Sequence, residues 1–191
     1  MIRRIDLLRH GEPVGGRMYR GQLDHPLSDR GWAEMRAAVG GMNHWDAIFH
    51  SPLLRCSAFA EQLAGQLDIP AQADERLKEI GFGVWEGKTR ADIEALEAGA
   101  LRRFYLDPVN HQPEGAERLR AFYLRVGEAW EALSTQEVYA RPLVVAHAGV
   151  IRAIICQVLK APLLSMYRLQ IPSAGLITIQ FGEQRPPSVL F

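Results

Sequence analysis

The side chains that could carry chemistry stand at the ends of short apolar runs. Arg9 and His10 directly follow the first such run, near the N-terminus. Arg55 comes shortly after a second run, and His147 directly follows a third, Leu143–Ala146. Two guanidinium groups and two imidazoles gathered at one place would make an anion site, because the forked N–H donors of arginine fit tetrahedral oxyanions such as phosphate. A neutral imidazole in such a site can attack phosphorus as a nucleophile.

Each of these residues could also have a purely structural role. Arg9 could pair with an acid, His10 could be a hydrogen-bonded core histidine, and Arg55 could be an exposed, solvated side chain. A zinc site is disfavoured, because the arginines would repel the cation and neither H-E-x-x-H nor paired C-x-x-C spacing is present. The sequence also lacks the G-x-S-x-G of many serine hydrolases, a P-loop and a dinucleotide fingerprint.

The spacing of apolar residues predicts strands that alternate with helices. We expect strands at about 2–9, 47–50, 69–73, 143–146, 176–181 and 186–191, and helices at about 29–40, 52–67, 89–98, 101–105, 116–133, 150–159 and 162–167. This alternation is typical of an open α/β sheet with a mostly parallel core, arranged as a three-layer sandwich. Ligands of such sheets bind beyond the carboxyl ends of the strands, so the arginines and histidines should converge on one edge.

Helix caps support several of these boundaries. Ser28 and Ser51 are expected N-caps, and Thr89 with Asp92 resembles a capping box. Arg55 then falls in the first turn of its helix, where the helix dipole disfavours a cation. An anion bound beside it would resolve that conflict. The glycine-rich loop after His10 could bring backbone N–H groups to the same anion, although it could equally be a surface turn.

The helical pattern at about 88–135 interrupts the strand–helix alternation. We expect it to be a helical cap that lies across the sheet within a single domain, 1–191. Its aromatic residues could face a ligand or belong to the core, and their helical periodicity favours the core. The residues concerned are Phe104, Tyr105, Phe122 and Tyr123.

The composition is that of an ordinary globular domain. The 191 residues include 22 basic and 22 acidic side chains, and 48% are hydrophobic. A balanced charge gives no indication of nucleic-acid binding or of a polybasic membrane surface. No apolar run is long enough for a transmembrane helix or a signal peptide, so we expect a cytoplasmic protein. Cys56 and Cys156 are expected to be buried free thiols rather than a disulfide.

Five short stretches, in order, resemble the motifs of the histidine phosphatase superfamily, which has the phosphoglycerate-mutase-like fold. They are Leu8-Arg9-His10-Gly11-Glu12, Asp24-His25-Pro26-Leu27-Ser28 with Gly31, Ser51-Pro52-Leu53-Leu54-Arg55, Leu77-Lys78-Glu79 with Phe82-Gly83 and Trp85-Glu86-Gly87, and Val145-Ala146-His147-Ala148-Gly149. The resemblance spans about residues 2–160.

The resemblance implies a role for each charged residue. His10 would attack phosphorus and become phosphohistidine, while Arg9, Arg55 and His147 would hold the phosphoryl oxygens. Glu79 would protonate the leaving alkoxide and then help to activate water, without a metal or a cofactor. The residues alone do not decide between Glu79 and Glu86 for this task.

The chain also departs from the family pattern. Gly16 stands where many members have a phosphate-binding asparagine, and Gln22 is the candidate to replace that contact. Ala148 replaces the first of two glycines in the second-histidine segment.

The resemblance favours hydrolysis over phosphoglycerate mutase activity, because the residues after Glu79 are apolar and the insertion is short. Within the phosphatases, the chain is most similar to bacterial α-ribazole phosphatases of cobalamin biosynthesis, with a broad-specificity sugar-phosphate or acid phosphatase as the alternative. A non-catalytic phosphoprotein binder is disfavoured because it would need neither His10 nor Glu79. The expected partner is a small phosphomonoester, and the oligomeric state stays open.

Overall fold

A six-stranded sheet forms the centre of the computed structural model, which describes residues 3–182 and 184–191. Its strands are β1 (Arg3–Arg9), β2 (Ile48–His50), β3 (Ala71–Ala73), β4 (Leu143–Ala146), β5 (Leu176–Gly182) and β6 (Arg185–Leu190). The order across the sheet is β3-β2-β4-β1-β5-β6. The first four strands in that order are parallel, and β5 and β6 are antiparallel to their neighbours. The predicted mostly parallel α/β fold is confirmed.

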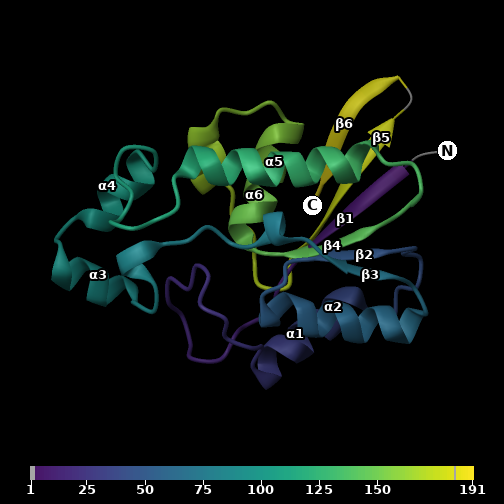
Figure 1. Ribbon diagram of the computed structural model, residues 1–191, viewed down its shortest axis with the longest axis horizontal. Helices are drawn as coiled ribbons and strands as arrows, with labels where there is room; N and C mark the ends of the chain where they lie inside the picture. Colours follow the sequence, from purple (N-terminus) through teal and green to yellow (C-terminus); the bar gives the residue numbers. More distant parts are fainter. Residues whose placement is uncertain (1–2, 183) are drawn as a thin grey trace.

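Helices cover both faces of the sheet, which gives the three layers (Figure 1). The α-helices are α1 (Asp29–Val39), α2 (Leu54–Leu67), α3 (Arg90–Leu96), α4 (Ala100–Leu106), α5 (Leu119–Thr135) and α6 (Ala148–Val158). Short 3-10 helices occur at Glu75–Leu77, Gly83–Trp85 and Leu163–Arg168. Helices α1 and α2 cover one face, and α5 and α6 cover the other.

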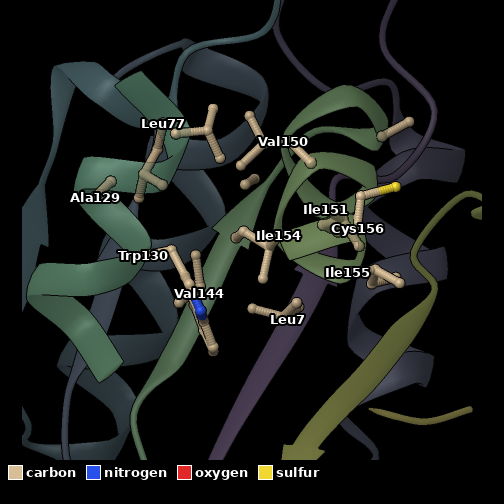
Figure 2. Close-up of a cluster of buried hydrophobic side chains, with 14 of the residues drawn as sticks. Leu7, Leu77, Ala129, Trp130, Val144, Val150, Ile151, Ile154, Ile155 and Cys156 are labelled. Atoms are coloured by element: carbon tan, nitrogen blue, oxygen red, sulfur yellow. The ribbon is translucent and has the colours of Figure 1, made fainter. Parts of the chain in front are cut away.

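The larger core lies between the sheet and helices α5 and α6. Figure 2 shows Trp130 of α5 and Ile154 of α6 converging on Val144 of β4 and Leu7 of β1. The apolar runs of β1 and β4 are fully buried because they lie at the centre of the sheet and are covered on both faces. This packing fixes the two strands from whose ends Arg9, His10 and His147 emerge.

Only α3 and α4 of the predicted cap stand away from the sheet. They form a separate small cluster in which Ile93, Leu101 and Phe104 pack against Trp85. Figure 1 shows them beside the loop that follows β1. In contrast, α5 is a layer of the main core.

Most predicted boundaries agree with the structure to within a few residues, and one cap is wrong. Ser28 caps α1 and Thr89 forms the capping box of α3 with Asp92, as expected. Helix α2, however, begins at Leu54 with Leu53 as its N-cap. Ser51 lies two residues before that N-cap, and its Oγ accepts from the Leu53 N–H at 3.3 Å and lies 2.7 Å from His147 Nε2.

In the middle of β1, opposite the first residue of β4, a buried carboxylate ties four segments together. Asp6 is 1% exposed and accepts hydrogen bonds from Trp45 Nε1 at 2.8 Å, Arg141 Nε at 3.2 Å and Thr178 Oγ1 at 2.5 Å. The His44 ring lies at 3.6 Å from the same carboxylate. We call these residues the Asp6 cluster. It stabilises the sheet end remote from the predicted site.

The two cysteines are buried free thiols in different cores. Cys56 lies on the α1–α2 side of the sheet and Cys156 on the α5–α6 side. Within the described part of the chain, no helix is long and apolar enough to span a membrane.

Candidate active site

The predicted site residues gather at the carboxyl ends of β1, β2 and β4. Strand β1 pairs in parallel with β4 so that Arg9 lies opposite Ala146, and the next residues are His10 and His147. A cavity of about 280 Å³ opens at this edge, and Arg9, His10, Arg55 and Glu79 line it. His147 is fully buried directly behind it.

Within residues 3–182 and 184–191, His10 has a hydrogen-bond partner at only one of its two ring nitrogens. Its Nδ1 lies 2.7 Å from the Gly11 carbonyl oxygen, and because a carbonyl can only accept, Nδ1 carries the proton. The lone pair of the neutral ring is therefore on Nε2. Burial lowers the pKa of His10 well below 6.5, and the charges of Arg55 and Arg9 lower it further. The ring is thus held neutral, in the form that a nucleophile requires.

His147 holds Arg55 in place. Arg55 Nε donates to His147 Nδ1 at 3.3 Å, so the proton of the neutral His147 ring is on Nε2, which donates to Ser51 Oγ at 2.7 Å. Burial lowers the pKa of His147 well below 6.5, with Arg55 as the next cause. The His147 ring packs edge-on against His10 with 5.2 Å between centroids.

Of the two predicted arginines, Arg55 is buried and Arg9 is partly buried, and neither uses all of its N–H donors. Arg55 is 1% exposed and donates from its two Nη atoms to the Gly21 and Leu23 carbonyls at 2.7 Å. Arg9 donates from Nη1 to the Ile171 carbonyl, whereas its Nε is buried without a partner. Desolvation lowers the pKa of Arg9. An anion in the cavity would supply the acceptor that these cations lack.

Glu79 reaches the cavity because Gly149 lets it approach. Its Oε1 accepts from the Ile80 N–H at 3.0 Å, and its Oε2 accepts from the Gly149 N–H at 3.1 Å. A Cβ on Gly149 would lie 2.2 Å from Glu79 Oε1, so a larger residue would displace the carboxylate. This position beside the start of α6 brings an acid next to the histidines.

Glu86 and Gln22 do not line the cavity. Glu86 Oε1 accepts from the backbone N–H groups of Gln22 and Phe82, each at 3.0 Å, and so ties two loops together. The Gln22 side chain donates to the Glu79 carbonyl at 3.2 Å. The geometry therefore favours Glu79 over Glu86 as the acid, and it places Gln22 as a support for the Glu79 loop.

The aromatic lining differs from the set considered in the sequence. Phe104 and Phe122 are core residues, and Tyr123 packs against the α5–α6 core. Of the four, Tyr105 alone lines the cavity, and it is joined there by Tyr19, Phe82 and Tyr167. Tyr105 Oη and Tyr19 Oη lie 2.7 Å apart, which connects α4 to the loop after β1. Phe82 belongs to the Glu79 motif, whereas Tyr19 lies in a loop and Tyr167 in a 3-10 helix, without a periodic pattern that would have indicated them.

Three further arginines line the cavity and were missed in the sequence. They are Arg17, Arg20 and Arg152. Arg152 did carry a signal, because it is the one charged residue in the mostly apolar helix α6. A cation on a buried helix, five residues after a candidate catalytic histidine, is a reason to look for an anion.

Comparison with known proteins agrees with this geometry. A family model described as "Histidine phosphatase superfamily (branch 1)" matches residues 5–191. Phosphoserine phosphatase 1 of Hydrogenobacter thermophilus is 29% identical over 95% of this chain and 88% of its own length. Glucosyl-3-phosphoglycerate phosphatase of Mycobacterium tuberculosis is 34% identical over 84% of this chain and 77% of its own length.

Solved structures show the same fold. The α-ribazole phosphatase of Shigella flexneri superimposes with a TM-score of 0.82 at 26% identity, and the match covers 94% of this chain and 91% of that one. The relatives thus share one fold and one reaction class, with different named substrates.

Proposed function

Because the chain belongs to the histidine phosphatase superfamily and is a phosphatase, we propose that it hydrolyses small phosphomonoesters through a phosphohistidine at His10. The observation that carries this proposal is the tautomer of His10. Its Nδ1–H donates a hydrogen bond to the Gly11 carbonyl, so the lone pair on Nε2 is available at the wall of an arginine-lined cavity.

In the first step, the Nε2 lone pair attacks phosphorus in line with the ester oxygen. The P–N bond forms while the P–O ester bond breaks, and Glu79 in its acid form gives its proton to the leaving oxygen, which departs as an alcohol. Arg9 and Arg55 balance the charge on the phosphoryl oxygens in the transition state. His147, predicted from the sequence to hold a phosphoryl oxygen, has both ring nitrogens engaged by Arg55 and Ser51, so we assign it the task of orienting Arg55 through the bond at Nδ1.

In the second step, the Glu79 carboxylate takes a proton from water while the water oxygen attacks phosphorus. The P–N bond breaks, its electrons return to Nε2 of His10, and inorganic phosphate leaves. Glu79 is again in its acid form, so the cycle closes with water as the only co-reactant. No step requires a metal, because the arginines supply the positive charge.

α-Ribazole 5′-phosphate, a cobalamin precursor, is the substrate that the sequence resemblance suggests. The similarity to the α-ribazole phosphatase of Shigella flexneri supports it. The aromatic side chains of Tyr19, Tyr105 and Tyr167 along the cavity could pack against a benzimidazole ring. Phosphoserine and glucosyl-3-phosphoglycerate, the substrates named for the two relatives in the sequence comparison, compete with it. The cytoplasm, with its reducing conditions, is our proposed location because both cysteines are free thiols.

The test of the reaction compares the wild type with His10→Ala on p-nitrophenyl phosphate. We expect the variant to release phosphate at less than about one thousandth of the wild-type rate, because the covalent route is lost. Equal rates would refute the proposal. His50→Ala is a matched control, since His50 is also a buried histidine at a strand end but does not line the cavity.

A further inference from the structure

The cavity carries more positive charge than a phosphoryl group needs. Five arginines line it, and the one acid among its lining residues is Glu79. They are Arg9, Arg17, Arg20, Arg55 and Arg152. A phosphomonoester brings about two negative charges at neutral pH. Two of the cations, Arg9 and Arg55, already suffice for the phosphoryl oxygens in the proposed reaction.

Arg152 and Arg17 are not ion-paired with a carboxylate in the part of the chain that the structure describes. The two nearby acids on the outside of this region, Glu12 and Glu34, pair with Arg30 instead. Arg9, Arg17 and Arg152 line the same cavity, and the charges of Arg152 and Arg17 add to the desolvation that lowers the pKa of Arg9.

Arg152 is held in a fixed position. Its Nε donates to the Leu169 carbonyl at 2.9 Å, and its guanidinium lies over the Tyr167 ring at 5.5 Å from the centroid. These contacts use one N–H and one face of the planar group, so both Nη atoms stay available to a ligand. Arg20 is different, because its Nη2 already donates to the backbone carbonyls of Val14 and Gly16.

We propose that Arg152, assisted by Arg17, forms a second anion subsite, so that the enzyme prefers phosphomonoesters whose alcohol half carries a further anionic group. This inference rests on the proposed phosphatase reaction and adds the class of its substrate. A carboxylate or a second phosphate offers the oxygen pair that a guanidinium fork binds. Substrates with a neutral alcohol half would leave these cations unpaired.

The experiment measures kcat/KM for phosphate release on matched pairs of substrates. The pairs are 3-phosphoglycerate with glycerol 3-phosphate, phosphoserine with phosphoethanolamine, and fructose 1,6-bisphosphate with fructose 6-phosphate. The first two pairs test a carboxylate and the third tests a second phosphate. We expect the wild type to prefer the anionic member of at least one pair by about tenfold or more, since the added bonds are charge-assisted.

Arg152→Gln should lower kcat/KM for the preferred anionic substrate about tenfold more than for p-nitrophenyl phosphate, mainly through KM. Arg152→Lys should restore part of the loss. Arg17→Gln, at an exposed position, should act in the same direction and gives a variant that keeps its fold. Arg168→Gln is the control, because Arg168 is exposed and outside the cavity.

Two results would overturn the inference. One is a wild-type enzyme whose kcat/KM is no higher for the anionic member of any pair than for its partner. A kcat/KM for α-ribazole 5′-phosphate above that of every anionic substrate would count against the inference in the same way. The other is an Arg152→Gln variant whose kcat/KM falls by the same factor for every substrate. Failure of the proposed function would look different, since the wild type would then release no phosphate from p-nitrophenyl phosphate.

Discussion

Removal of the Ser51 hydroxyl tests whether His147 positions Arg55. Ser51 Oγ lies 2.7 Å from His147 Nε2, and both residues are fully buried, so no solvent can replace the bond. In Ser51→Ala, the Nε2 proton keeps only the weak acceptor Cys56 Sγ, 3.7 Å away, and loss of the hydroxyl costs about 1–3 kcal/mol. The ring can avoid that cost by moving the proton to Nδ1, but Nδ1 then no longer accepts from Arg55 Nε. Either outcome disturbs the guanidinium.

If the whole of that cost falls on the orientation of Arg55, kcat/KM should drop about 5-fold to 150-fold. The assay is steady-state hydrolysis of p-nitrophenyl phosphate, with urea unfolding to separate stability from activity. Ser57→Ala is the matched control, because Ser57 is a buried serine on helix α2, near Arg55, that does not line the cavity. Wild-type kcat/KM together with wild-type stability in Ser51→Ala would refute the reasoning.

The geometry makes three more predictions. On the acid side, kcat/KM corrected for substrate ionisation should fall only well below pH 6.5, because the lowered pKa of His10 keeps its ring neutral down to that pH range. A fall in kcat/KM centred at pH 6.5 would contradict this. Gly149→Ala should slow hydrolysis of alkyl phosphates more than that of p-nitrophenyl phosphate, because the p-nitrophenolate leaving group needs little proton donation from Glu79. Gly65→Ala is the control, since Gly65 has open space around it and the change should affect neither rate. An equal loss of rate on both substrates in Gly149→Ala would argue against Glu79 as the acid. Asp6→Ala should lower the free energy of unfolding by about 2–3 kcal/mol with little change in kcat, because the donors of the Asp6 cluster lose their acceptor; urea unfolding at wild-type stability would contradict it.

The sheet and its catalytic edge could be predicted because they depend on local patterns. Residues 5–8 of β1 and 143–146 of β4 are buried on both faces, so apart from Asp6 these stretches are hydrophobic, and each is followed by polar residues. In parallel strands such ends meet at one edge, which is why His10 and His147 lie together. The placement of Arg55 followed from the same reasoning.

The rest depends on contacts between distant segments, which no local pattern encodes. Ser51 has the sequence context of an N-cap, yet its hydroxyl serves His147, which is 96 residues away. Tyr123 and Tyr105 have similar helical spacing, but only Tyr105 faces the cavity, because α5 packs on the sheet and α4 does not. The sequence marks Arg152 as a cation on a buried helix, but its position beside Tyr167 and Arg17 depends on how the loops of the fold come together.

The central claim is that phosphate passes through His10. Its most direct test is rapid acid-free quenching of the enzyme during turnover of a ³²P-labelled phosphomonoester, followed by peptide mapping of the label. The account predicts one alkali-stable, acid-labile phosphohistidine, located at His10, with a burst amplitude that disappears in His10→Ala. Label on another residue, or turnover without any labelled protein at the shortest times, would contradict it.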